Sequence, residues 1–229
     1  MSEVEQVLRT YRRNLSNNSK LRRILMNPNG YHDVVTYAKA AGVELADAML
    51  KFGNLENLTE DELFTLFDTC LQANHSDVMK LAKKVQRMIY DAADIGIGVL
   101  EPEYDRKTAK NLVDALIDGR ETFDNLKNLL SKESLRTSDD TIRKNSEAAE
   151  KMGLKTRIIR RYDGVGLRDD TKYAEPCKWC LEREGEWDNY ADALADGAFN
   201  RHPGCGCYIE YKVGKTHTWS NSAGVWTDM

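Results

Sequence analysis

Four of the five cysteines of this 229-residue chain lie in two close pairs in its last quarter. The first pair is Cys177 and Cys180, and the second pair, Cys205 and Cys207, comes just after His202. Two thiolates at such spacings can bind one metal ion, and a second pair brought back by a loop completes a tetrahedron. The spacing therefore predicts a structural zinc knuckle held by Cys177, Cys180 and Cys205, with either Cys207 or His202 as the fourth ligand.

Other chemistries use similar cysteine spacings. A zinc deaminase needs an upstream H-x-E besides the P-C-x-x-C at Pro176–Cys180, and neither His32 nor His75 begins one. A thioredoxin-type redox motif needs its C-x-x-C at the start of a helix in a βαβ core, which the order of the expected elements does not offer. An HNH-type nuclease also uses paired cysteines as a zinc staple. Although no ββα-metal arrangement is recognisable around His202 or His217, a metal-dependent nuclease or toxin-like enzyme remains the alternative function.

Charge and hydropathy exclude further classes. A net charge of −4 disfavours a protein whose main role is to coat nucleic acid, although it leaves room for a local basic patch. No apolar run approaches the ~20 residues that span a bilayer, and the N-terminus lacks the apolar core of a signal peptide. We therefore expect no membrane partner and a reducing cytoplasm, where paired cysteines are more often metal ligands than disulfides. Cys70 is expected to be a small buried apolar residue.

Residues 1–153 follow helical patterns for most of their length. Capping-box sequences at Ser2–Glu5 and Thr59–Glu62 predict two helix starts. Apolar residues at helical spacing predict an amphipathic helix over Val78–Ala92, and further helices are expected near residues 112–117, 123–130 and 139–152. Gly42 is a candidate helix break. Ile95–Pro102 is expected to be extended, and Ser131–Ser138 to form a polar surface connection between two helices.

The pattern changes after residue 153. Arg157–Tyr162 and Tyr208–Val213 read as strands, and Trp187–Phe199 reads as a short helix that ends near Gly197. A segment this small needs a metal ion to fold. The sequence thus predicts a mainly α fold, with a helical body over residues 1–153 and a small C-terminal α/β zinc-knuckle cap over residues 154–229.

Several stretches together resemble a known family. They are Ala92–Gly98, Asp139–Asn145, Gly153–Arg161, Cys177–Cys180 and Arg201–Tyr211. In this order they are similar to the Mu F-like head-morphogenesis family, the minor head proteins of tailed phages, in the versions found in phages and prophages of Gram-positive bacteria. Family members typically end in C-x-x-C, a spacer and R-H-x-x-C-R-C before a strand. Gly206 stands here in place of the family's arginine, which removes a cation beside the metal site.

The resemblance implies a non-enzymatic minor head, or minor capsid, protein with no small-molecule substrate. It would act in head assembly and portal-associated DNA packaging or delivery, with the portal or the major capsid protein as partner. Its place would be the virion head, and the bacterial cytoplasm during assembly. A cytosolic zinc-knuckle adaptor unrelated to phages is a third hypothesis.

Two basic stretches are candidates for weak contact with double-stranded DNA. One comprises Lys80, Lys83, Lys84 and Arg87, which more simply form a solvated helix face. The other comprises Arg157, Arg160, Arg161, Arg168 and Lys172. The aromatic residues Tyr211, Trp219 and Trp226 either fold back on the cap or dock on a partner.

Overall fold

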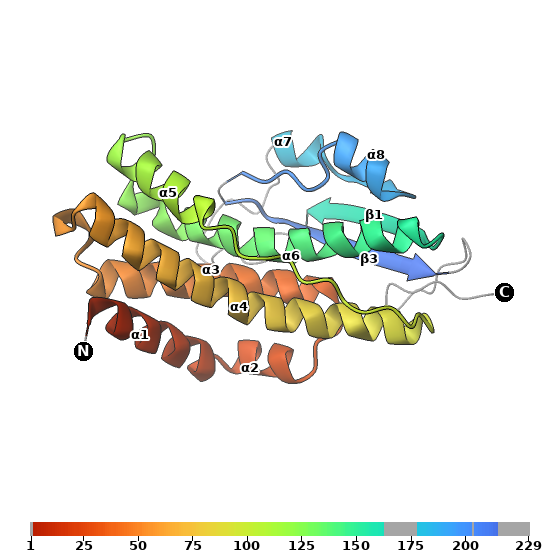
Figure 1. Ribbon diagram of the computed structural model, residues 1–229, viewed down its shortest axis with the longest axis horizontal. Helices are drawn as coiled ribbons and strands as arrows, with labels where there is room; N and C mark the ends of the chain where they lie inside the picture. Colours follow the sequence, from red (N-terminus) through yellow and green to blue (C-terminus); the bar gives the residue numbers. More distant parts are fainter. Residues whose placement is uncertain (1, 163–177, 203, 215–229) are drawn as a thin grey trace.

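The computed structural model describes residues 2–162, 178–202 and 204–214. In these residues it is mainly helical, with eight α-helices and one three-stranded antiparallel sheet near the C-terminus (Figure 1). The predicted mainly α fold is therefore confirmed. The helices are α1 (Glu3–Asn17), α2 (Ser19–Met26), α3 (Tyr31–Phe52), α4 (Glu60–Ala92), α5 (Lys107–Ile117), α6 (Leu126–Lys151), α7 (Lys178–Leu181) and α8 (Tyr190–Ala195). The strands are β1 (Lys155–Tyr162), β2 (Gly185–Trp187) and β3 (Cys207–Gly214).

The body is built on three long helices, α3, α4 and α6, which pack against one another, with α1 covering α3 and α4 (Figure 1). Both predicted capping boxes are present, because Ser2 and Thr59 accept hydrogen bonds from the backbone N–H groups of Glu5 and Glu62. Cys70 is fully buried in α4, as expected. No helix in the described ranges is long and apolar enough to cross a membrane.

The expected surface connection over Ser131–Ser138 is wrong, because these residues form the middle of the single helix α6. Ser134, Thr137 and Ser138 are buried there rather than exposed. The hydroxyl of Ser134 stays against its own helix, because its Oγ donates to the carbonyl oxygen of Leu130, one turn earlier. Small hydroxyl residues therefore line a tight helix–helix contact, which a reading of polarity alone mistakes for surface.

The expected break at Gly42 is also wrong, since α3 runs through it. A Cβ atom at this position would lie 2.5 Å from the Cα and the backbone nitrogen of Ser131. The glycine thus allows α3 and α6 to approach each other closely in the middle of the body.

The segment that includes Ile95–Pro102 has no helix, as expected, and crosses the surface between α4 and α5. Asn145 of α6 holds it in place. The side-chain amide of Asn145 accepts from the Leu100 N–H at 2.9 Å and donates to the Leu100 carbonyl at 2.8 Å. The side chain thereby replaces the partner strand that an extended segment would otherwise need.

The sheet has the order β2-β1-β3, and both neighbouring pairs are antiparallel. The structure confirms the two predicted strands and adds β2, which pairs with β1 through Ile158 opposite Trp187. The inner face of the sheet packs on the body: Ile158, Ile209 and Val213 belong to the same buried cluster as the core of the helices. The sheet follows α6 in the chain, and it shares its core with the body.

Candidate metal centre

Three of the predicted zinc ligands converge at one end of the cap. Cys180 lies in α7, Cys205 lies in the loop before β3, and Cys207 is the first residue of β3. Their three sulfur atoms lie within 4.8 Å of one another, and all three residues are buried. The Cys180–Cys205 separation is 3.8 Å, which is about the sulfur–sulfur distance around a tetrahedral ion with metal–sulfur bonds of about 2.3 Å. This buried cluster could hold a metal ion.

His202 belongs to the same site, because its Nε2 atom lies 3.0 Å from Cys180 Sγ. Its ring also meets the indole of Trp179 edge-on, with the centroids 5.1 Å apart. Cys177 lies outside the described residues. The structure thus brings both alternatives for the fourth position, His202 and Cys207, to the site.

The loop that carries Cys205 depends on two glycines. Gly204 has a φ of +74°, a conformation that a residue with a side chain rarely adopts. At Gly206 a Cβ atom would lie 2.5 Å from the ring of Tyr162, which is paired with Cys207 across β1 and β3. Gly206 therefore makes room for an aromatic ring that packs against the cluster.

Two buried arginines provide positive charge at the same sulfur. Arg160 of β1 is fully buried, and its Nη2 atom lies 3.7 Å from Cys205 Sγ. Its Nη1 atom donates to the carbonyl oxygens of Ala198 and Asn200, at 2.7 and 2.6 Å. In the sequence Arg160 belonged to a stretch that was only a candidate for weak DNA contact. Alternation along the strand indicates its true position, because Arg160 lies two residues after the buried Ile158 and so faces inward with it.

Arg201 is the second buried cation, and it joins the cluster to the body. Its Nη1 atom donates to the carbonyl oxygen of Cys207 at 2.7 Å and lies 3.8 Å from Cys205 Sγ. On its other side it forms a two-pronged ion pair with Asp139 of α6, with Nη2 2.8 Å from Oδ1 and Nε bonded to Oδ2. Both side chains are almost wholly buried. Sequence reasoning missed this pair, although both residues lie in stretches that carry the family resemblance.

The surroundings favour a thiolate at Cys205. The hydrogen bond from Cys207 lowers the pKa of the Cys205 thiol; burial opposes this, and Arg201 and Arg160 lower the pKa further. The shared hydrogen bond to Cys205 conversely raises the pKa of Cys207. Burial raises the pKa of Asp139, against the opposing effect of Arg201. Three thiolates and a divalent ion would leave one negative charge, which the two arginines and Asp139 together balance with one positive charge.

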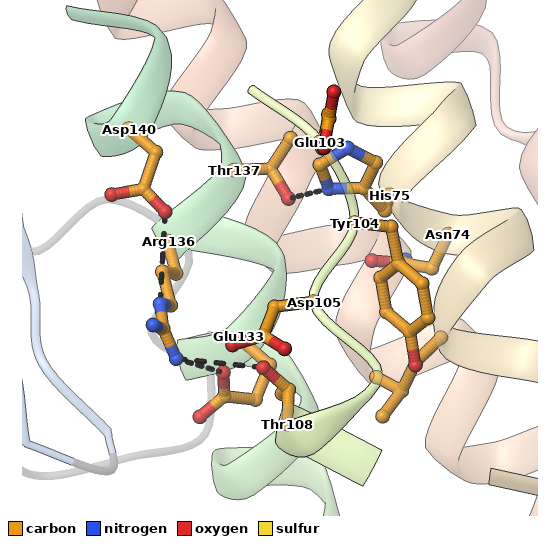
Figure 2. A pocket seen from close by; sticks show the side chains of 11 residues that line it. Asn74, His75, Glu103, Tyr104, Asp105, Thr108, Glu133, Arg136, Thr137 and Asp140 are labelled. Atoms are coloured by element: carbon orange, nitrogen blue, oxygen red, sulfur yellow. Dashed lines mark hydrogen bonds and ion pairs between the residues drawn. The ribbon is translucent and has the colours of Figure 1, made fainter. Parts of the chain in front are cut away.

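A second polar site lies in the body, in a small pocket of about 50 Å³ between α4, α6 and the start of α5 (Figure 2). His75 lines it, with one ring nitrogen 3.1 Å from Thr137 Oγ1 and the other 3.1 Å from the Pro102 carbonyl oxygen. Arg136 forms ion pairs with Glu133 and Asp140 of its own helix, and its Nη1 atom lies 3.5 Å from Thr108 Oγ1 of α5. Both nitrogens of His75 are engaged in these contacts. His75 therefore links the segment before α5 to α6 and has a structural role in this pocket.

The two basic stretches considered for DNA contact are largely neutralised. Lys80, Lys83 and Arg87 form ion pairs with Asp77, Glu101 and Asp91, and Lys84 donates to backbone carbonyls at the end of α2. In the cap, Arg157 pairs with Asp188 and Arg161 with Glu186. Arg168 and Lys172 lie outside the described residues, as do Trp219 and Trp226. Tyr211 is buried in β3.

No family model, curated protein or solved structure matches this chain.

Proposed function

We propose that this chain is a minor head protein of a tailed phage, a non-enzymatic component acting in head assembly and portal-associated DNA packaging or delivery. The observation that carries the proposal is the meeting of three stretches that resemble the Mu F-like family. Asp139 comes from the stretch 139–145, Arg160 from 153–161, and Arg201 and Cys205 from 201–211. These four residues form one buried network. Residues chosen for their resemblance are thus the residues that build the site.

The ion that best suits the site is zinc. Thiolate and imidazole donors in a small tetrahedral arrangement are the usual ligands of structural zinc. Cys180, Cys205 and Cys207 would supply three of them, and His202 or Cys177 the fourth. A neutral His202 preserves the balance of charge described above, whereas a fourth thiolate would leave one negative charge in excess.

Burial favours a structural role for the ion over a catalytic one. The three cysteines are between 0% and 4% exposed, which leaves little room for the bound water that a catalytic zinc site keeps. The competing function, a metal-dependent nuclease, requires such a water. Incubating the metal-loaded protein with duplex DNA and Mg²⁺ or Mn²⁺ separates the two. Cleavage that Cys205→Ser abolishes would favour the nuclease.

The metal assignment is tested by the metal content of protein purified without added metal. We expect one zinc per chain in the unmodified protein and none in Cys205→Ser. Hydrogen exchange should show protection lost around residues 178–181 and 205–207 on chelation, while α1 and α4 keep theirs. His202→Ala and Cys177→Ser then identify the fourth ligand, because only its removal releases the ion. A metal-free protein with a full count of free thiols would overturn the zinc site.

The head function needs a test in the phage or prophage that encodes the chain. We expect deletion of the gene to yield heads with reduced DNA content or infectivity, and the intact gene to restore them. Pull-down with the portal protein and with the major capsid protein, each tested separately, identifies the partner. Normal, infectious particles without this protein would overturn the proposal.

A further inference from the structure

The first two helices carry an exposed row of positive charge, here called the α1–α2 ridge. Its members are Arg9, Arg12, Arg13, Lys20, Arg22 and Arg23, and all six are exposed. No aspartate or glutamate occurs between residues 6 and 32, so this stretch is strongly basic in a chain whose net charge is −4. The ridge lies on the outer side of the body, away from α7 and α8 of the cap (Figure 1).

The ridge differs from the other basic stretches because its charge is not neutralised. Among the described residues, none of its six side chains takes part in an ion pair or a side-chain hydrogen bond. Lys83 of α4 and Arg157 of β1, in contrast, face carboxylates of their own chain, Glu101 and Asp188. A solvated helix face commonly mixes both signs of charge. Six cations with no carboxylate between them therefore form a surface that attracts an anionic partner.

The ridge is also held rigidly. The opposite faces of α1 and α2 bury Val7, Tyr11, Leu15, Leu21 and Ile24 in the body. Asn18 joins the two helices directly: its backbone N–H donates to α1, and its side chain accepts from the Leu21 N–H at the start of α2. At 1.5 Å per residue within the helices, the row from the first to the last cation spans about 21 Å along the chain.

We propose that the α1–α2 ridge binds the phosphate backbone of double-stranded DNA without reading its sequence. Five of the six cations are arginines, whose planar guanidinium group can give two hydrogen bonds to one phosphate. Exposed Asn17 and Ser19 lie between them and offer the neutral donors that commonly accompany phosphate contacts. This inference rests on the surface alone and holds with or without the proposed head function.

Other partners fit this surface less well. A protein interface needs aromatic or aliphatic anchors at its centre, and Tyr11, the only aromatic residue of α1 and α2, is buried in the body. Single-stranded nucleic acid would need exposed rings for its bases to stack on. A membrane-bound amphipathic helix places its apolar face in the lipid, whereas the apolar faces of both helices are turned inward. The exposed Leu25 and Met26 lie beyond the last cation of the row.

The test measures binding of the full metal-loaded chain to a labelled duplex of about 30 base pairs, by fluorescence anisotropy over a series of salt concentrations. One variant combines Arg9→Gln, Arg12→Gln and Arg13→Gln. The matched control combines Lys110→Gln, Arg120→Gln and Lys151→Gln, which removes the same charge from exposed cations that pair with Asp114, Asp118 and Glu147. Circular dichroism verifies that both variants fold.

We expect the ridge variant to lose at least about tenfold in affinity at low salt, and its plot of log K against log salt to become shallower by roughly 2 to 3. The control variant should stay within about twofold of the unmodified protein. Equal losses in both variants would overturn the proposal, since net charge alone would then explain binding. It would also be overturned by the absence of duplex binding, by preference for a single strand of the same sequence, or by binding through the ridge only to phosphatidylserine vesicles.

Discussion

The helical body and the cysteine end of the cap both bury polar groups, but they do so in opposite ways. In the body the buried polar side chains are mostly neutral, and several bond to nearby backbone or to another neutral group, as Ser134 does with Leu130 and Asn74. In the cap they are ionised or readily ionised: Arg160 and Arg201 surround the sulfur of Cys205. A neutral network can tolerate local change, whereas buried charges depend on every partner being present.

The ion pair between Asp139 and Arg201 is where the two regions meet. Asp139 belongs to α6 of the body, and Arg201 belongs to the loop that carries His202 and Cys205. The body thus contributes one charge to the balance of the metal centre. The comparison predicts that changes at this joint have the largest effects on stability, and that changes confined to the neutral body have smaller ones.

The largest loss is expected from Arg201→Met, which leaves the carboxylate of Asp139 buried without its partner. Breaking a buried ion pair in this way typically lowers the free energy of unfolding by about 3–5 kcal/mol. Urea unfolding followed by circular dichroism measures it. The double variant Asp139→Asn with Arg201→Met should recover much of the loss, because no unpaired carboxylate remains. Equal destabilisation of the single and double variants would contradict the joint proposed here.

A smaller loss is expected from Gly42→Ala, which acts within the body alone. The new Cβ atom would meet the backbone of Ser131 at 2.5 Å and force α3 and α6 apart. Overpacking of this kind lowers stability by about 1–3 kcal/mol, even though alanine is intrinsically the better helix former by about 1 kcal/mol. Gly98→Ala is the control, since nothing lies within 4 Å of its Cβ position. Metal content should be unchanged in both variants.

The same contrast explains how much of the fold could be predicted from the sequence. The apolar periodicity of Val78–Ala92 and the capping boxes at Ser2 and Thr59 are local signals, and they predicted helices correctly. Ser131–Ser138 was misread because its polar residues face another helix, a fact that depends on the distant Gly42. Patterns within one segment do not show which face a partner from another segment will cover.

The candidate metal centre shows the same division. Cysteine spacing alone brought Cys180, Cys205 and Cys207 together correctly. The charges around them could not be found in this way, because Asp139 and Arg201 lie 62 positions apart in the chain. Only the alternation along β1, which turns Arg160 inward with Ile158, offered a local signal.

An effect of about 1 kcal/mol is expected at the start of α4, where Thr59→Ala removes a capping residue. The Thr59 hydroxyl accepts from the backbone N–H of Glu62, and the Glu62 carboxylate accepts in return from the Thr59 N–H. The Thr59 backbone N–H and, to a smaller extent, its hydroxyl donate to the Glu62 carboxylate and lower its pKa. The variant removes only the hydroxyl, so that pKa should move part of the way back toward its ordinary value. Thr65→Ala, an exposed threonine one turn further along the helix, is the control and should change stability by less than about 0.5 kcal/mol. Urea unfolding and carboxyl NMR titration provide the two readouts.

The smallest effect on stability is expected at His75, a residue of the body whose burial favours the neutral imidazole. Burial lowers its pKa below the value of about 6.5 for an unfolded chain, so the unfolded chain binds the proton more readily. The stability that depends on neutral His75 is therefore complete above this pH and is lost as the pH falls below it. The loss is at most about 0.7 kcal/mol between pH 7 and pH 6. His75→Gln should flatten the dependence by that amount, as measured by urea unfolding at each pH. If the free energy of unfolding changed equally with pH in the two proteins, protonation of His75 would not destabilise the body. The contrast between a neutral body and a charged cap would then be contradicted at this residue.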